Sequence, residues 1–250
     1  MIIAVDGVSG SGKTTIAKKL AKELGFAFFS AGLFYRAITL NAVLNNVMPT
    51  EDTKLINLLN NSQIELFCNK DGTNSCFLNN KDVTSLLNTE EISGQVAAYS
   101  AKDFVLDYVH KLEIQTSKNN PNIIMDGRDI GSVVFPNAEL KIFVTCSAET
   151  RAKRRTAQLA GQGQNVSYEK VYSELIMRDF KDANRKLCPL KKVEDAYTID
   201  TSNITINQGV VKAIKYAFRK DPNKQIINSN KAQAVVDYFV NSHCFRTLQK

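Results

Sequence analysis

A glycine-rich segment near the start of the chain constrains the fold more than any other feature. The apolar run at residues 2–5 and the following Asp6 lead into a turn, residues 7–14, that reads Gly-Val-Ser-Gly-Ser-Gly-Lys-Thr. Residues 15–24 then have helical character. Strand, glycine-rich turn and helix in this order are typical of a phosphate-binding P-loop. A glycine turn without a ligand is the alternative, and the flanking strand and helix count against it.

The residue types in this turn suit the binding of a triphosphate. Gly7, Gly10 and Gly12 let phosphate approach the backbone N–H groups and tolerate positive φ. These N–H groups and the dipole at the helix start favour an anion. Lys13 can reach the β- and γ-phosphates, and the Thr14 hydroxyl can hold Mg²⁺. We predict that ATP binds at Gly7, Val8, Ser9, Gly10, Ser11, Gly12, Lys13, Thr14 and Thr15.

Composition limits the class of protein. With 250 residues, 44% of them hydrophobic, the chain can form one large α/β domain or a core with inserted lobes. It has no run of about 18 apolar residues, so we expect no membrane span. The first residues belong to the P-loop strand, so we expect no cleavable signal. The five cysteines lie far apart without a CxxC, which predicts neither a disulfide framework nor a zinc site but reduced thiols in a cytoplasmic protein.

The net charge of +7 raises the question of nucleic-acid binding. The densest basic cluster, Arg151, Lys153, Arg154 and Arg155, falls on one predicted helix. Such a helix usually has a solvated face, whereas in a P-loop protein it can face phosphates.

Buried strands predict a parallel core sheet. Core strands are predicted at residues 26–29, 123–125, 140–146 and 197–200, in addition to the first strand, with helical segments between them. Crossover helices imply parallel strands with right-handed connections, so we predict five parallel strands flanked by helices. Asp126 ends one strand, where an acidic residue in a P-loop protein is expected to hold Mg²⁺ through water. A purely structural carboxylate is the alternative.

Residues 50–87 do not fit this core. Segments 63–67 and 75–78 alternate apolar and polar residues, turns are predicted at residues 71–72 and 79–80, and a third short strand is predicted to begin at Val83. This is the pattern of a small antiparallel meander in an inserted lobe.

Two further helices, joined by a glycine-rich tip at residues 161–164, resemble a mobile lid. On the second of them, Arg178, Asp182 and Arg185 are spaced to share one face. A surface row of salt bridges is the alternative reading of that spacing.

Taken together, these segments resemble the bacterial cytidylate kinases, a family of nucleoside monophosphate kinases. The similarity runs from residue 1 to about residue 218. The motifs that carry it are residues 7–14, Gly32 with Tyr35-Arg36, Gln95-Val96-Ala97-Ala98, Asp126-Gly127-Arg128-Asp129-Ile130-Gly131 with Val133-Val134-Phe135-Pro136, and Arg178-Asp179 with Asp182, Arg185 and Pro189-Leu190.

The resemblance implies transfer of the γ-phosphoryl group of ATP to CMP or dCMP, with Mg²⁺. Lys13, Arg36, Arg128 and Arg185 would then be catalytic, and Thr14 with Asp126 would hold the metal. Lid residues Arg151, Arg154 and Arg155 would close over ATP. The acceptor would contact Ala31, Tyr35, Arg36, Gly94, Asp103, Arg128, Asp129, Arg178, Asp182 and Arg185.

The same resemblance assigns the parts of the chain. Residues 1–218 would be a P-loop kinase, with its core at 1–30, 120–147 and 195–218. The acceptor-binding lobe would be 31–119, with the antiparallel insert at about 62–84, and the lid about 148–186. The family implies a cytoplasmic monomer without a nucleic-acid partner. Residues 219–250 form an extension to which we assign no role, with an amphipathic helix predicted at 232–240.

The chain departs from the family on the side of the acceptor base. Ser30 and Ala31 replace an acidic residue and a serine or threonine, Gly94 replaces a serine, and Asp103 replaces an arginine, whereas Asp129, expected to contact cytosine, is kept. Each lost polar contact weakens base discrimination by roughly 1–3 kcal/mol, which predicts altered selectivity. The alternatives are a P-loop kinase for another nucleoside monophosphate, and a nucleotide- or RNA-binding paralogue without turnover.

Overall fold

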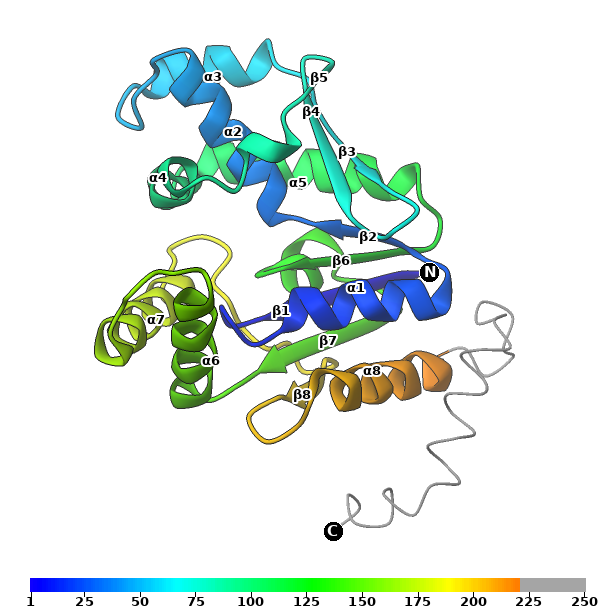
Figure 1. Ribbon diagram of the computed structural model, residues 1–250. Coiled ribbons are helices and arrows are strands. Elements are labelled where there is room, and N and C mark those ends of the chain that lie inside the picture. The colour runs from blue at the N-terminus through cyan, green and yellow to red at the C-terminus, as the bar shows by residue number, and fades with distance from the viewer. Residues whose placement is uncertain (221–250) are drawn as a thin grey trace, which may run out of the picture.

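The computed structural model describes residues 1–220, so the predicted helix at 232–240 lies outside the described residues. The core sheet has the strand order β2-β6-β1-β7-β8, and all neighbouring strands are parallel (Figure 1). The predicted five-stranded parallel sheet is therefore confirmed. Its strands are β1 (Ile2–Gly7), β2 (Ala27–Ser30), β6 (Ile123–Gly127), β7 (Leu140–Thr145) and β8 (Tyr197–Asp200).

Side chains along each strand point alternately to the two faces of the sheet, so the hydrophobic core has two layers. On β1, Ile3 and Val5 pack against helices α1 (Lys13–Leu24) and α8 (Ile206–Lys220), while Ala4 faces the opposite side. Both sides are fully buried, as expected for a parallel sheet covered on each face. The sheet is therefore a rigid base for the loops at its carboxyl edge.

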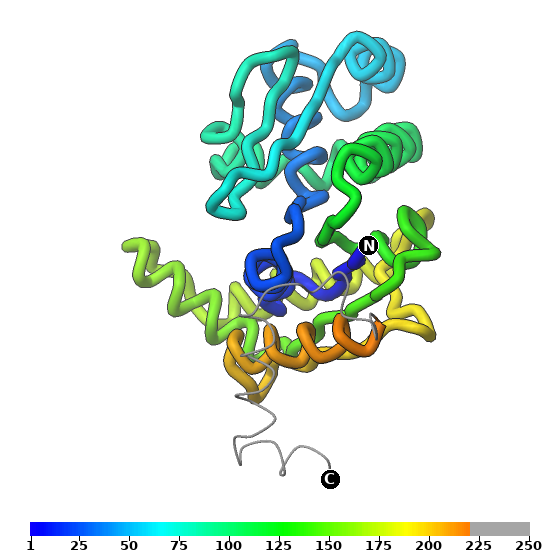
Figure 2. Tube along the Cα trace, turned by 90° about the vertical axis from the view of Figure 1, so that its right-hand side faces the viewer, coloured from blue at the N-terminus to red at the C-terminus, as the bar shows by residue number. Residues whose placement is uncertain are grey.

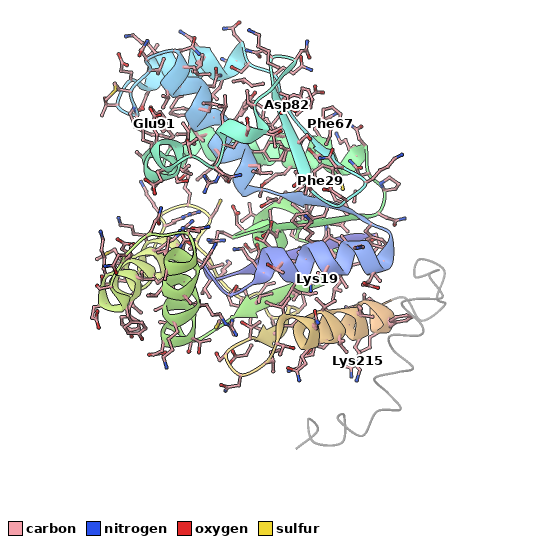
Figure 3. The ribbon with its side chains drawn as sticks, in the orientation of Figure 1. Lys19, Phe29, Phe67, Asp82, Glu91 and Lys215 are labelled. Atoms are coloured by element: carbon pink, nitrogen blue, oxygen red, sulfur yellow. The ribbon has the colours of Figure 1, made fainter. Side chains whose placement is uncertain are left out.

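The inserted lobe lies on the side of the sheet away from α8 (Figures 1 and 2). It consists of α2 (Gly32–Leu44), α3 (Asp52–Asn60), α4 (Glu90–Ser100) and α5 (Asp103–Lys118), the short helical turn η1 (Thr84–Leu86), and the strands β3 (Ile64–Cys68), β4 (Asn74–Leu78) and β5 (Lys81–Asp82). Phe29 on β2 joins the same hydrophobic cluster as the inner side of the small sheet (Figure 3).

The antiparallel meander is confirmed, but its third strand lies before Val83 rather than beginning there. Asn79 and Asn80 both have positive φ, 48° and 65°, as a tight two-residue hairpin turn requires. Pairing therefore resumes at once, with Leu78 opposite Lys81. The two asparagines correctly predict a turn, and because this turn has only two residues, the third strand begins at Lys81.

Two antiparallel helices form the predicted lid region, α6 (Ala148–Gly161) and α7 (Tyr168–Ala183), at the carboxyl edge of the sheet (Figure 1). Ala152, Leu159 and Val171 form a small core of their own between them. Ser147 and Ser167 cap the two helix starts by accepting backbone N–H bonds. A separate core and firm caps let the pair hold together as a unit.

Two further sequence expectations concern membranes and cysteines. Among the described helices, none is long and apolar enough to cross a bilayer. The four cysteines within residues 1–220 are all free thiols, as their spacing predicted.

Candidate active site at the carboxyl edge of the parallel sheet

The P-loop backbone is shaped by its glycines. Gly12 precedes α1 with φ 85° and provides no side chain to cap the helix, so the first N–H groups of α1 remain available to an anion. Gly10 also has positive φ, 74°. At Gly7 a Cβ would lie 2.0 Å from the carbonyl oxygen of Val144, so only glycine fits against β7. The backbone of this turn therefore has the left-handed glycines and the close approach to β7 that a phosphate-binding loop requires.

Lys13 is buried at the base of this loop, with 8% of its surface exposed. Burial and the nearby charge of Arg128 together lower its pKa to about 8, while Asp126 acts in the opposite sense. The ammonium group is therefore still mostly protonated at pH 7. A desolvated positive charge next to a helix start is a strong attractor for phosphate.

Thr14 and Asp126 meet as predicted for a metal pair. The Thr14 hydroxyl donates a hydrogen bond to Asp126 Oδ2, linking α1 to the end of β6. The other carboxylate oxygen, Oδ1, is buried and has no hydrogen-bond partner within residues 1–220. A buried unpartnered carboxylate oxygen beside a hydroxyl is a donor set that suits Mg²⁺, so the residues fit the ion.

Asp6 has a structural role that the sequence analysis did not assign. Its carboxylate accepts hydrogen bonds from the backbone N–H groups of Ile130, at 2.9 Å, and Gly131, at 2.7 Å. Burial outweighs the opposing effect of those two N–H groups and raises the pKa of Asp6 to about 6. Asp6 thereby fixes the loop after β6 to the P-loop strand. Its place directly before the glycines was the only sequence signal.

The buried carboxylate of Asp182 binds two arginine side chains. Asp182 of α7 is 4% exposed, and it accepts a hydrogen bond from Arg128 Nε at 2.8 Å and from Arg185 NH2 at 2.6 Å. Burial raises the pKa of Asp182, but the nearby guanidinium groups, first that of Arg128, bring it below its usual value. The alternative of a surface row of salt bridges is therefore wrong for Asp182.

Arg178 and Arg36 complete the cluster of positive charges. Desolvation lowers the pKa of Arg178, and the charges of Arg128, Arg36 and Arg185 also act on it. By its solvent-accessible surface, however, Arg178 is an exposed residue. Arg36 donates to the carbonyl oxygen of Leu87 and to Ser93 Oγ, each at 2.8 Å. We call Arg36, Arg128, Arg178 and Arg185 the arginine cluster. Segments far apart in sequence thus bring four guanidinium groups together near Lys13.

The three basic residues of α6 differ in what they contact. Arg151 is 4% exposed, forms a bidentate pair with Asp179 at 3.1 and 2.6 Å, and donates to the carbonyl oxygen of Ser9 at 3.0 Å. Arg154 donates to the carbonyl oxygen of Thr201 at 2.7 Å. Arg151 therefore holds the P-loop to the lid in this conformation and has little freedom to reach ATP.

Arg155 is exposed like Arg154, but within residues 1–220 its hydrogen bond goes to Gln158 on its own helix, at 3.1 Å, and not to another element. Arg155 is therefore the least constrained of the three arginines.

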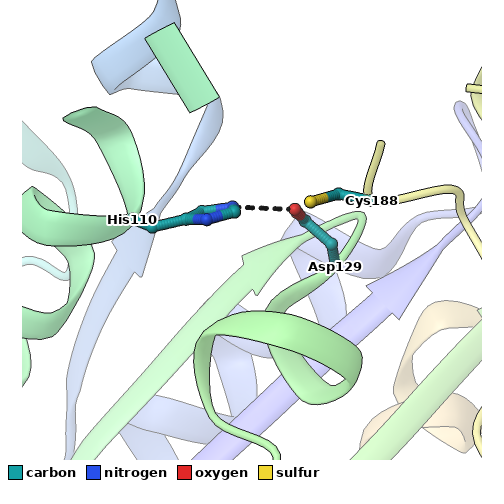
Figure 4. Close-up of side chains that lie close together, drawn as sticks. All are labelled: His110, Asp129 and Cys188. Carbon is teal, nitrogen blue, oxygen red and sulfur yellow. Dashed lines mark hydrogen bonds and ion pairs between the residues drawn. The ribbon is translucent and has the colours of Figure 1, made fainter. Parts of the chain in front are cut away.

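Asp129, the carboxylate expected to contact cytosine, lies among other side chains that can bond to it. This carboxylate is buried and lies 3.0 Å from His110 Nε2, and Cys188 lies close to both (Figure 4). Burial raises the pKa of Tyr35, and Glu113 and Asp129 raise it further. The sequence analysis missed His110 and Cys188, although His110 is one of only two histidines in the chain.

Three positions where the sequence departs from the family lie in different surroundings. Asp103 is exposed at the first turn of α5, and Lys102, directly before that helix, pairs with Asp52 at 2.6 Å. A Cβ at Gly94 would meet nothing within 4 Å. Ala31 is buried at the start of α2, and its backbone N–H donates to the carbonyl oxygen of Asp126 at 3.0 Å. Gly94 and Ala31 therefore offer no polar side chain to an acceptor base.

Glu113 is a second buried carboxyl that the sequence did not reveal. It is 1% exposed, and its Oε2 has no hydrogen-bond partner in the described part of the chain. Burial raises the pKa of Glu113 well above its usual value, and the charges of Asp129 and Asp6 raise it further. Burial therefore favours the protonated, neutral form of this side chain.

The profile of the family described as "Cytidylate kinase" matches residues 3–219. The chain belongs to the cytidylate kinase family. It is 40% identical over 221 residues to the cytidylate kinase of Carboxydothermus hydrogenoformans, covering 88% of this chain and 99% of that one. To the cytidylate kinase of Bacillus subtilis it is 40% identical over 218 residues, covering 87% and 96%. The family match extends from β1 almost to the end of α8, so it includes the core sheet, the inserted segment and helices α6 and α7.

Proposed function

We propose that this chain transfers the γ-phosphoryl group of ATP to CMP or dCMP, giving ADP and CDP or dCDP. The observation that carries the proposal is the convergence of Lys13 and the arginine cluster at the carboxyl edge of the sheet. Ligands in parallel α/β folds bind at that edge. Membership of the cytidylate kinase family supplies the chemical class of donor and acceptor.

The residues suit a reaction in which positioning matters more than acid–base chemistry. The acceptor is already an anionic phosphate, so no strong general base is required, and catalysis comes from alignment and charge stabilisation. We assign the donor phosphates to the P-loop backbone and Lys13. We assign binding of the acceptor phosphate and the transferring group to Arg36, Arg128 and Arg185, because one guanidinium group can bond two phosphate oxygens at once. Arg178 and Asp182 are assigned to the ribose.

Thr14 and Asp126 would hold Mg²⁺, the first through its hydroxyl and the second through water. When bound, Mg²⁺ neutralises charge on the β- and γ-phosphates. The support for this assignment is the unpartnered Asp126 Oδ1 beside the Thr14 hydroxyl. Of the α6 arginines, Arg155 is assigned to ATP, and Arg151 with Arg154 to holding the P-loop and the β8 end in place.

We also propose that base selectivity differs from that of the family. The position of the family's arginine is occupied by Asp103, and the neighbouring ammonium of Lys102 is engaged with Asp52. Asp129 stays as the polar partner for cytosine. Turnover of CMP, dCMP, UMP and AMP over a concentration range tests this proposal, and a strict preference for CMP at normal efficiency contradicts it.

A coupled assay with ATP, Mg²⁺ and CMP tests the proposed reaction. We expect saturable formation of ADP that requires CMP. Lys13→Ala should reduce kcat by about 100-fold or more, since a charge that stabilises the transition state is lost. The melting temperature should stay close to that of the native chain. Absence of turnover in the native chain, with salt-sensitive binding of RNA, would favour the alternative of a binding paralogue.

The family resemblance also supports a cytoplasmic monomer. Size-exclusion chromatography with light scattering tests the oligomeric state, and a stable dimer at micromolar concentration would contradict it.

A further inference from the structure

Three side chains with metal-binding atoms meet on the base side of the site. His110 comes from α5, Asp129 from the loop after β6, and Cys188 from the segment between α7 and β8. One ligand atom from each lies within 4.8 Å of the other two. Figure 4 shows the three side chains directed toward one another from separate elements. This His–Asp–Cys cluster is not used by the phosphate chemistry described above.

We propose that the His–Asp–Cys cluster binds a zinc ion. Imidazole nitrogen, carboxylate oxygen and thiolate sulfur are all zinc ligands. With bonds of about 2.0–2.3 Å in a tetrahedron, neighbouring ligand atoms lie roughly 3.3–3.8 Å apart. The two atoms of His110 and Asp129 are already 3.0 Å apart, and Cys188 has to approach by roughly 1 Å at most. Three protein ligands leave the fourth position to water or a substrate atom.

The backbone at Cys188 is a second observation that points to this cluster. Its φ is 48°, in the left-handed region that non-glycine residues rarely adopt. Such outliers occur mainly at functional sites, where surrounding structure holds them. Two residues later, the Leu190 N–H donates to the carbonyl oxygen of Asp182 at 2.8 Å and anchors the segment. The thiol is thereby presented to Asp129 (Figure 4).

The ligand types separate this site from the magnesium site. Thr14 and Asp126 offer only oxygen, which suits a hard cation such as Mg²⁺. A thiolate and an imidazole select zinc and related metals instead. The cysteine spacing could not have revealed the cluster, because its three ligands come from distant segments and include a single cysteine.

Zinc in the cluster would compete with the acceptor. This step rests on the proposed function, in which Asp129 contacts the cytosine base. A carboxylate that ligates zinc is withheld from the base, so the zinc-bound form should bind CMP more weakly. The site would thus make acceptor binding sensitive to free zinc, while ATP binding at the P-loop is unaffected.

Titration of the full-length chain with Co²⁺, in the absence of nucleotide, tests metal binding without requiring kinase activity. The second histidine, His243, lies beside Cys244 outside the described residues. A background chain with His243→Ala and Cys244→Ala therefore removes binding there. We expect one equivalent of Co²⁺ with a thiolate-to-cobalt charge-transfer band, displaced by Zn²⁺. No band in this background overturns the proposal.

Single substitutions in that background identify the ligands. Cys188→Ala should abolish the charge-transfer band, and His110→Ala should weaken binding by more than the 10–100-fold that a lost outer-shell partner costs. Cys68→Ala, which removes a partly exposed thiol on β3, is the matched control and should leave the band unchanged. Circular dichroism and melting temperature establish that each variant is folded. A band that survives Cys188→Ala contradicts the assignment.

Steady-state kinetics then test the competition. With buffered free Zn²⁺, the apparent KM for CMP should rise in proportion to the metal while kcat and the KM for ATP stay constant. Cys188→Ala should remove this effect. Metal binding without any change in the KM for CMP would overturn the competition and leave the cobalt result standing.

Discussion

The substitution Glu113→Gln tests the most unusual electrostatic feature of the fold. Glu113 is almost fully buried, its Oε2 has no partner among the described residues, and burial raises its pKa well above the ordinary value of 4.5. The folded chain therefore releases this proton at a higher pH than the unfolded chain, in which the carboxyl titrates near pH 4.5. Glutamine has nearly the same shape and does not titrate.

The magnitude follows from proton linkage. Because the unfolded state binds fewer protons than the folded state above pH 4.5, the free energy of unfolding falls as pH rises, by up to about 1.4 kcal/mol per unit. The fall continues until pH passes the raised folded pKa. The free energy of unfolding of Glu113→Gln, minus that of the native chain, should therefore grow as pH rises above 4.5, by at most about 1.4 kcal/mol per pH unit.

Urea denaturation followed by circular dichroism at pH 5, 6 and 7 measures this difference; the chain has no tryptophan to serve as a probe. A metal chelator in all samples keeps the neighbouring His–Asp–Cys cluster free of zinc. The matched control is Glu65→Gln, the same change on an exposed face of β3. A difference between Glu113→Gln and the native chain that is constant with pH, or shrinks as pH rises, would refute the reasoning.

Three other substitutions test the phosphate side of the site. Asp182→Asn removes the charge partner of two guanidinium groups; charge-assisted bonds contribute about 1.5–3 kcal/mol, so kcat/KM for CMP should fall about 10–100-fold in the coupled assay, and an unchanged value would be inconsistent with the geometry. Arg151→Lys loses the bidentate pair with Asp179, and urea denaturation should show a loss of about 1–3 kcal/mol; equal stability would argue against the pair. Gly7→Ala forces a Cβ to 2.0 Å from the Val144 carbonyl oxygen, so its melting temperature should drop by several degrees or the protein should not accumulate, and a native melting curve would be unexpected.

The parts of the fold that could be predicted from the sequence are those with local signals. The P-loop is specified within eight residues, because glycine spacing, lysine and threonine each have a direct physical role there. Core strands such as β1 and β6 are predicted by the continuous apolar residues at 2–5 and 123–125. The third strand of the insert was placed too late, because a pair of asparagines can support turns of different lengths. Only the pairing of Leu78 with Lys81 decides which turn forms.

Site residues could be predicted where the residue type itself implies a ligand, as for the P-loop lysine. They could not be predicted where tertiary packing determines which side chains come into contact. The sequence predicts Arg151 as a lid residue that closes over ATP, but its pair with Asp179 and its burial against α7 could not be predicted from the sequence. Asp6 and Glu113 carry no motif, and their unusual environment exists only after distant segments have closed around them. The contact of His110 with Asp129 likewise depends on α5 packing beside the loop after β6.

Binding of a bisubstrate analogue tests the central claim most directly, since the claim is that one set of cationic groups holds two nucleotides end to end. The analogue joins adenosine and cytidine through five phosphates, and calorimetry in the presence of Mg²⁺ measures its affinity. We predict one molecule per chain, bound more tightly than ATP or CMP alone, displaced by either nucleotide, and weakened by both Lys13→Ala and Arg128→Ala. An analogue that binds no more tightly than ATP, or that CMP does not displace, would contradict the account.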